Sequence, residues 1–236
     1  MQRKVFIDGA AGNFRAALID RLTRSGANLC EENGKADISI GIGNESSGDI
    51  VILPKQANPG NSSLVIRISD LVIPWGGDGW GTEILNKWLE NIKKGKIEFN
   101  HEELDFRHWV HINDVVEALA ILIVEDLQIH DIEEMEICGR RTWSDLDVFD
   151  ELQMLWSRYQ NSVNHSHTVE SLSSIPSPVR GGSVDDSNRP DLSLIHNILI
   201  GTGREGWHPK TPMRTTLMEL IAFSESTTYD PYQSEL

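Results

Sequence analysis

Residues 4–15 read Lys-Val-Phe-Ile-Asp-Gly-Ala-Ala-Gly-Asn-Phe-Arg, and this stretch decides the fold. The apolar run at 4–8 predicts a short buried strand, and the two glycines that follow predict a tight turn. Residues 14–25 carry apolar side chains at helical spacing, and Gly26 is suited to end that helix. A strand, a glycine turn and a helix in this order open a mononucleotide-binding α/β unit.

The glycine turn matches the pattern Gly-x-x-Gly-x-x-Gly at two of its three glycines, with Arg15 at the third position. Glycine permits the sharp turn and the approach of a pyrophosphate, while the helix N-terminus donates N–H groups. Arg15 has two interpretations, contact with a phosphate or obstruction of the dinucleotide position, and the alternative to both is a βα turn without a ligand. The candidate cofactor-binding residues are Gly9, Ala11, Gly12, Asn13, Phe14 and Arg15.

Further elements are expected along the whole chain. Strands are predicted at 28–32, 37–43, 49–53, 64–68 and 134–137, and helices at 82–94, 115–124, 144–159, 191–199 and 212–223. Asn113 or Asp114 is the expected cap of the second of these helices and Ser144 that of the third. Residues 161–191 are predicted to form a long loop. Because the links between the strands at 37–43, 49–53 and 64–68 have only 5 and 10 residues, at least one crossover must be a bare loop.

The composition excludes several classes of function. A net charge of −15 and a pI of about 4.9 leave no basic stripe for nucleic acid, and they oppose binding to anionic membranes. No apolar run approaches the length of a membrane span. The two cysteines form no paired motif and are expected to be reduced, which favours a cytoplasmic location.

Four further segments follow one another in a recognisable order. Residues 66–76 resemble the stretch Leu-Arg-Pro-x-Asn-Val-Tyr-Gly-Pro-Gly, and residues 107–115, Arg-His-Trp-Val-His-Ile-Asn-Asp-Val, resemble Arg-Asp-Phe-Val-His-Val-Asp-Asp-Val. Residues 179–182 resemble an Arg-Pro-Gly loop, and residues 206–209 resemble Leu-Gly-Trp-x-Pro. The four stretches that they resemble are motifs of the extended short-chain dehydrogenase/reductase family of nucleotide-sugar epimerases, dehydratases and reductases. The chain therefore resembles this family.

The resemblance implies an α/β fold with a reduced, Rossmann-like, mostly parallel sheet flanked by helices, and a small C-terminal substrate-type lobe. Residues 1–160 would form the nucleotide-binding core, with contributions from C-terminal segments, and 161–236 a loop-rich lobe and tail. The implied cofactor is NAD or NADP, and the choice stays open because Glu31 or Glu32 could be the ribose-binding acid. Arg107 and Arg180 match arginines that grip the substrate diphosphate, although each could instead be a surface arginine paired with a carboxylate.

The catalytic Tyr-x-x-x-Lys motif of that family is absent. Tyr159, Tyr229 and Tyr232 are followed four residues later by Val, Gln and Leu. Family members carry roughly a hundred residues between the second strand and the strand matched by 64–68, whereas this chain has only about 30 there. The catalytic residues are therefore unknown, and a family dimer built on the missing helix is not expected.

The main hypothesis is a pseudoenzyme that binds a nucleotide or nucleotide sugar, with a protein partner or an altered oligomer. One alternative is an active epimerase or reductase with a rearranged catalytic group, recruited from His108, Asp105 and Lys55. The other is a structural or regulatory subunit without a ligand.

Overall fold

The computed structural model describes residues 2–9, 11–76, 79–96, 99, 105–125, 132–168 and 190–226. The strands are β1 (Lys4–Gly9), β2 (Asn28–Cys30), β3 (Ile38–Ile42), β4 (Gly48–Pro54), β5 (Ser62–Ile68), β6 (Leu71–Val72), β7 (Phe106–Arg107), β8 (Val110–His111), β9 (Glu134–Ile137) and β10 (Trp143–Ser144). The helices are α1 (Asn13–Arg24), the 3-10 turn η1 (Asn33–Lys35), α2 (Glu83–Lys93), α3 (Ile112–Val124), α4 (Asp145–Val163), α6 (Ser193–Gly201) and α7 (Met213–Glu225).

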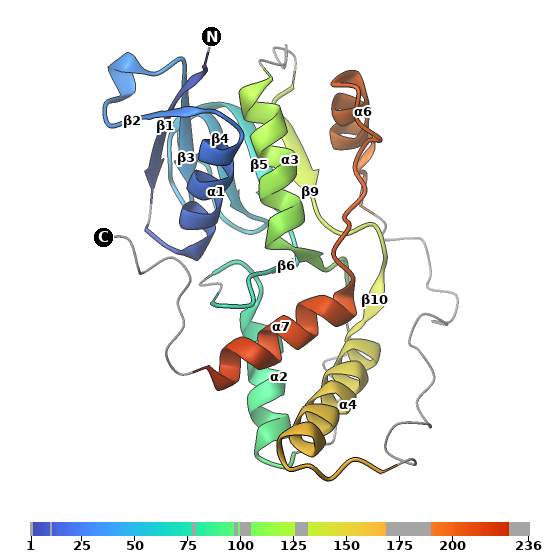
Figure 1. Ribbon diagram of the computed structural model, residues 1–236. Coiled ribbons are helices and arrows are strands. Elements are labelled where there is room, and N and C mark those ends of the chain that lie inside the picture. Colours follow the sequence, from blue (N-terminus) through green and yellow to red (C-terminus); the bar gives the residue numbers. More distant parts are fainter. Residues whose placement is uncertain are drawn as a thin grey trace.

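The chain folds into two parts that lie end to end. One part is a six-stranded sheet with α1, α3 and α6, and the other gathers α2, α4 and α7 (Figure 1). The sheet has the order β2-β1-β3-β4-β5-β9, and every neighbouring pair is parallel. This arrangement confirms the predicted α/β, Rossmann-like fold and all six predicted strands of the large sheet, with ends shifted by at most two residues.

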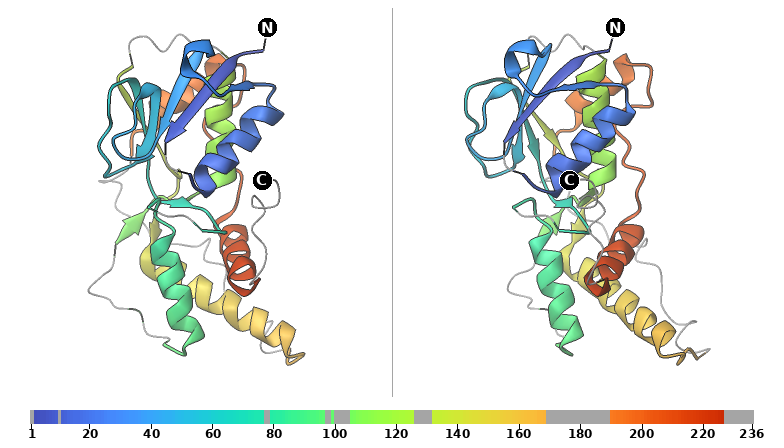
Figure 2. Two further views of the ribbon diagram at one scale, coloured as in Figure 1. Left: turned by 90° about the vertical axis from the view of Figure 1, so that its left-hand side faces the viewer. Right: turned by 60° about the vertical axis from the view of Figure 1, so that its left-hand side comes forward.

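One face of the sheet is covered by helices. Alternate residues of β1, β3, β4 and β5, such as Val5, Ile40, Ile52 and Ile66, point to this face and are fully buried. They pack with the apolar side chains of α1 and α3, which Figure 2 shows on the same side of the sheet. The nearly continuous apolar sequence of α3 is explained by this position, because its inner face meets the sheet and its flanks meet α1 and α6.

The opposite face is covered by two short connections instead of helices. Residues 43–47 link β3 to β4, and residues 55–61 link β4 to β5. The two loops pair with each other, since Gly60 N donates to Ser46 O at 2.8 Å. Gly41 lies directly beneath, and a Cβ at that position would be 2.7 Å from Ser47 O. Both crossovers are therefore bare loops, where the short spacing had required at least one.

A second core lies between α2, α4 and α7. Its fully buried side chains include Leu85, Phe149, Leu152 and Leu217. The aromatic ring of Trp88 meets that of Phe149 edge-on, with centroids 6.2 Å apart. Two small strand pairs, β6 with β8 and β7 with β10, join this core to the large sheet.

Two helix starts test the predicted caps. Ser144 caps α4 as predicted, because its Oγ accepts from Asp147 N at 3.0 Å. The predicted cap of α3 was wrong, since that helix begins at Ile112 and His111 is the capping residue. The ring Nδ1 of His111 accepts from Asn113 N at 3.2 Å, which is a role that Ser, Thr, Asp or Asn usually fills. Helix α4 also runs four residues beyond its predicted end, and most of the loop predicted at 161–191 lies outside the described residues.

None of the helices in the described ranges is long and apolar enough to cross a bilayer.

Candidate functional site

The glycine turn after β1 leaves an open helix start. Gly9 has φ +113°, and a Cβ there would overlap the Ile42 carbonyl oxygen, so only glycine fits. Helix α1 starts at Asn13, and its cap residue Gly12 has no side chain to bond the first N–H groups. Apart from the two chain neighbours of Gly12, no described residue has an atom within 4 Å of a Cβ built on this glycine, and both Ala11 and Gly12 are exposed. The first turn of α1 can therefore donate N–H groups to an anion.

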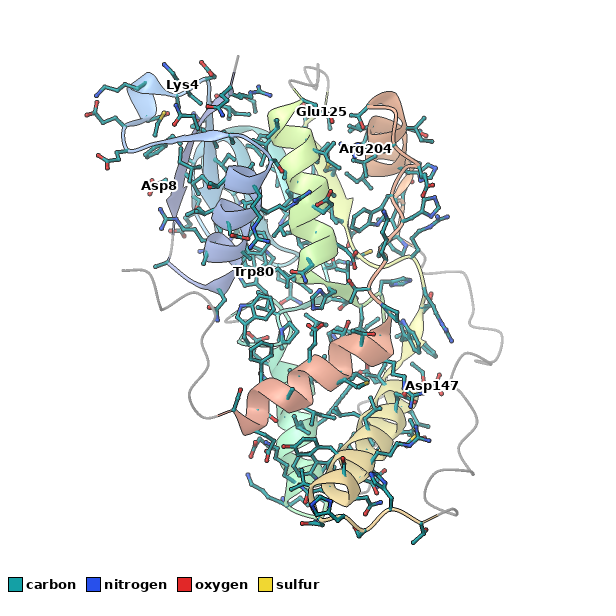
Figure 3. All side chains as sticks on the ribbon, viewed as in Figure 1. Lys4, Asp8, Trp80, Glu125, Asp147 and Arg204 are labelled. Carbon is teal, nitrogen blue, oxygen red and sulfur yellow. The ribbon has the colours of Figure 1, made fainter. Side chains whose placement is uncertain are left out.

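Two side chains of this helix start hold the following loop in place. Phe14 is buried and stacks on Trp80 with ring centroids 4.2 Å apart. Trp80 is labelled in Figure 3. Asn13 Nδ2 donates to Gly76 O at 2.9 Å and to Trp75 O at 3.3 Å. Because both side chains have these partners, the backbone N–H groups are the polar groups of the two residues that are left to bond an anion.

Acidic residues surround the turn. Asp8, which Figure 3 labels at the end of β1, is exposed, and its carboxylate accepts from Gly9 N at 2.8 Å. Beyond β2, Glu31 is exposed, while Glu32 forms an ion pair with Lys35 at 2.9 Å. Glu31 and Glu32 both follow the end of β2, where a ribose-binding acid is expected, and Asp8 places a negative charge at the turn.

Arg15 turns toward β1. Its Nη2 donates to Ile7 O at 3.2 Å, and its buried Nε has no hydrogen-bond partner among the described residues. The last residue pair between β1 and β2 is Phe6 with Cys30, and Ile7 is the next residue of β1. The Arg15 guanidinium therefore contacts β1 close to the end of β2. Glu31 is the first residue after β2 and lies near the same place.

Arg107, in β7, is surrounded by carboxylates. Its Nε donates to Asp145 Oδ1 at 3.1 Å, its Nη2 is 3.4 Å from Asp105 Oδ2, and its Nη1 is 3.7 Å from Asp70 Oδ1. Asp145 is fully buried at the start of α4, and burial raises the pKa of its carboxyl to about 6 although Arg107 opposes the shift. Three carboxylates around one guanidinium leave a local field that opposes a diphosphate.

The other predicted residues have structural partners or lie outside the description. Arg180 is outside the described residues. His111 is buried with Nε2 3.1 Å from Glu219 Oε2, and burial lowers the pKa of its ring, against the effect of Glu219. Of the residues considered for a rearranged catalytic group, His108 Nε2 meets Thr142 Oγ1 at 2.9 Å and Lys55 pairs with Glu136 at 3.3 Å. In the described parts of the chain, no three His, Cys, Asp or Glu side chains are grouped to hold a metal ion.

Sequence reasoning missed a cavity of about 350 Å³ between β8, α4, α7 and the turn after β9. The only local signal is the pair Arg140-Arg141, which directly follows the buried Cys138 and Gly139. The remaining walls come from residues up to about a hundred positions apart, from Trp109 to Leu217, and no sequence pattern joins them.

Comparison with known proteins identifies the fold. No family model matches the chain, and no curated protein matches it. Among solved structures, a dTDP-glucose 4,6-dehydratase from Bacillus anthracis str. Ames in complex with NAD is similar with a TM-score of 0.54 and 10% identity, over 95% of this chain and 97% of that one. RMD from Pseudomonas aeruginosa complexed with NADPH is similar with a TM-score of 0.55 and 10% identity, over 97% and 99%. The Bordetella bronchiseptica enzyme WbmH in complex with NAD+ is similar with a TM-score of 0.54 and 13% identity, over 97% and 100%.

These structural neighbours are a dehydratase in complex with NAD, RMD in complex with NADPH and an enzyme in complex with NAD+. The resemblance found in the sequence is thereby confirmed for the fold, and identities of 10–13% establish the fold alone.

Proposed function

We propose that this protein binds a nucleotide, in the first place NAD or NADP, at the open start of α1, without the standard catalysis of the family whose fold it shares. The observation that carries the proposal is the uncapped helix start at Gly12, which follows a parallel strand and lies beside open space. Such helix starts bind phosphate through their free N–H groups and the helix dipole.

The residues present fit the phosphate and ribose parts of a dinucleotide. The backbone N–H groups of Asn13 and Phe14 would hold the pyrophosphate, and the Glu31 carboxylate would accept from ribose hydroxyls. Arg15 lies near the same corner as Glu31 and could meet an additional phosphate on the ribose, so the two residues favour opposite cofactors. A bound nicotinamide supplies hydride transfer, whereas the residues of this chain bind and orient it.

The absence of the family's acid and base supports a pseudoenzyme. No tyrosine in the sequence is followed four residues later by lysine. In the family that the chain resembles, such a pair stands on a helix within the interval that is shortened here, and this interval contains the bare loops 43–47 and 55–61. A proton donor for the substrate is therefore missing from its usual place.

The surroundings of Arg107 make a nucleotide sugar the weaker candidate ligand. A diphosphate that binds Arg107 must displace Asp145, Asp105 and Asp70 from the guanidinium or share it with them. We therefore rank NAD or NADP above a nucleotide sugar as the ligand.

The test is a titration of the purified protein with NAD, NADP, UDP-glucose and dTDP-glucose by calorimetry and thermal unfolding. A ligand at 100 times its dissociation constant adds about 2.7 kcal/mol of stability. Binding without turnover supports the proposal, turnover supports the rearranged enzyme, and the absence of any binding supports a subunit without a ligand.

Gly12 offers a matched pair of variants for this titration. Aspartate or serine at this position can cap α1, because the space around Gly12 is open and its backbone is extended. Gly12→Asp places a negative charge where the phosphate would lie and should abolish binding, whereas Gly12→Ser is neutral and should weaken it less. Equal affinity in both variants would place the nucleotide elsewhere.

A further inference from the structure

The cavity between β8, α4, α7 and the turn after β9 is separate from the glycine turn, since no residue of that turn lines it. It has a volume of about 350 Å³, which lies within the range of small-molecule sites. A cavity of about 150 Å³ is enough for a benzene ring, so a single ring with a polar group attached fits here. Helices α4 and α7 contact each other on one side of the cavity, and the short strand β10 leads directly into α4 (Figure 1).

The charged residues around the cavity are mostly cationic, in contrast to the chain as a whole. The sequence has 36 acidic and 21 basic residues, whereas the cavity is lined by three arginines, Arg140, Arg141 and Arg214, and by one carboxylate, Glu151. Glu151 is buried, and its Oε1 lies 3.6 Å from Arg214 Nε, so this carboxylate is already paired with one of the arginines. Three arginines and one carboxylate give the lining a formal charge of +2 on a protein of net charge −15, and this local field attracts an anion.

Two of these arginines are adjacent in the turn after β9. Arg140 and Arg141 are both exposed, so a molecule that enters from solvent can reach them. Nη1 of Arg140 is 2.6 Å from Nδ1 of His208, and the Arg141 guanidinium lies 3.9 Å from the centroid of the Trp143 ring. His208 and Trp143 also line the cavity, which places both guanidinium groups at its wall. A guanidinium that a neighbouring ring already orients loses less freedom when it binds an anion.

The rest of the wall is largely apolar. Val148 and Leu217 are fully buried there, and Pro209, Pro212 and Met213 also belong to it. The first turn of α7 borders the cavity as well, and the helix dipole adds to the positive field at that end. An apolar wall beside exposed guanidinium groups matches a ligand with two unlike ends, an apolar body and an anionic group.

We propose that the cavity binds a small organic anion, with a single-ring apolar body on the apolar wall and a carboxylate or phosphate group on Arg140 and Arg141. Both groups are oxyanions that accept two parallel hydrogen bonds from a guanidinium, so the two arginines can hold either one. The apolar body displaces water from the wall, which is favourable in proportion to the apolar area covered. No contact of this ligand involves the glycine turn, so the proposal is independent of nucleotide binding at α1.

The test is isothermal calorimetry of the full chain with single-ring probes and with their anionic groups alone. Phenylacetate and phenyl phosphate have a ring and an anion, phenylethanol has the ring without a charge, and acetate and inorganic phosphate have the charge without a ring. We expect phenylacetate or phenyl phosphate to bind at least about tenfold more tightly than phenylethanol and than its own anion alone. The tighter of the two then identifies the anionic group. The proposal is overturned if neither ring anion reaches this preference, or if no probe shows saturable binding at millimolar concentration.

The two exposed arginines can be changed without disturbing the core. A variant with both Arg140→Gln and Arg141→Gln keeps polar side chains but removes both charges. It should bind the preferred ring anion roughly tenfold or more weakly, because hydrogen bonds between charged groups are the stronger ones, and it should bind phenylethanol as wild type does. A variant with both Arg140→Lys and Arg141→Lys keeps the charges and should retain more of the affinity, which separates loss of charge from loss of folding. Wild-type affinity for the ring anion in the glutamine variant contradicts the assignment.

A matched pair of arginines elsewhere controls for the change in net charge. Arg24 and Arg204 are exposed, pair with Asp20 at 2.7 Å and with Glu125 at 3.5 Å, and do not line this cavity. Figure 3 labels Arg204 and Glu125, which lie at the opposite end of α3 from α7. A variant with both Arg24→Gln and Arg204→Gln changes the net charge by the same amount and should leave all affinities at the wild-type values. An equal loss of anion affinity in the two glutamine variants would indicate non-specific attraction, which overturns the role of the cavity arginines.

Discussion

The guanidinium of Arg107 and the fully buried carboxylate of Asp145 form an ion pair, with Nε 3.1 Å from Oδ1. The pair joins β7 to the first residue of α4, and so it connects the strand that carries the family-like arginine to the second core. Asp70 and Asp105 lie 3.7 Å and 3.4 Å from the same guanidinium. Arg107 therefore has a structural role in the folded protein, whether or not it also binds a ligand.

The first prediction concerns the pH dependence of stability. Burial raises the pKa of Asp145 to about 6 in the folded protein, against about 3.9 in the unfolded chain. The folded state therefore binds the proton more tightly, and the contribution of Asp145 to the free energy of unfolding falls as pH rises from about 4 to about 6. Two pKa units correspond to about 3 kcal/mol. The side chain in Asp145→Asn cannot titrate, so this variant does not lose that stability. As pH rises from about 4 to about 6, its free energy of unfolding should therefore increase relative to that of wild type by about 3 kcal/mol.

Urea unfolding of both proteins between pH 4 and pH 8 measures this difference. Asp147→Asn is the control, since Asp147 is exposed in the same turn of α4 (Figure 3). A difference between wild type and Asp145→Asn that does not change with pH would contradict the raised pKa.

The second prediction separates the structural and binding roles of Arg107. Arg107→Ala leaves the Asp145 carboxylate buried without its partner, which should lower the free energy of unfolding by about 3–5 kcal/mol at pH 8. The loss should be smaller at pH 5, where Asp145 is protonated. In the same variant, affinity for dTDP-glucose should fall while affinity for NAD stays unchanged, and unaltered affinity for dTDP-glucose would remove Arg107 from the ligand site.

Local patterns in the sequence predict the start of the fold well. The strand, turn and helix at residues 4–24 depend on neighbours close in sequence, and the structure places them as expected. The sequence left open that Arg107 pairs with a carboxylate, and the structure shows such pairs. The partners Asp70 and Asp145 were not predictable, because they are 37 and 38 residues away and meet the arginine only after folding. His111 was missed as a cap because side-chain preferences at helix starts favour smaller polar residues.

The connections between the strands of the sheet were also predictable only in part. Short spacing predicted a bare crossover, but the close contact of Gly41 with Ser47, only six residues further along the chain, depends on the path of the loop, which no periodic pattern reveals. The cavity beside Glu151 was not predictable either, since its walls come from strands, helices and loops that are far apart in the sequence.

The third prediction concerns Asp8. Its exposed carboxylate lies at the turn that we propose to hold a phosphate, so Asp8→Asn should raise the affinity for NAD by roughly two- to fivefold. Asparagine keeps an acceptor for Gly9 N–H, and the turn should therefore keep its shape. Calorimetry at low and high salt measures the gain, which should shrink at high salt because an exposed charge is screened. Asp20→Asn, at the other end of α1 beside Arg24, is the control and should leave the affinity unchanged.

The fourth prediction tests the bare crossovers. In Gly41→Ala the new Cβ would lie 2.7 Å from Ser47 O and 3.0 Å from Ser46 Cβ, so the loop 43–47 must move away from the sheet. Overpacking of this kind costs about 1–3 kcal/mol, and here it also disturbs the bond from Gly60 N to Ser46 O that joins the two loops. We expect the free energy of unfolding to fall by about 2–3 kcal/mol. Gly34→Ala is the matched control, because no atom lies within 4 Å of a Cβ at Gly34, and its stability should stay within about 0.5 kcal/mol of wild type. If urea unfolding showed equal stability for both variants, the loops would not be packed against the sheet as tightly as the glycines indicate.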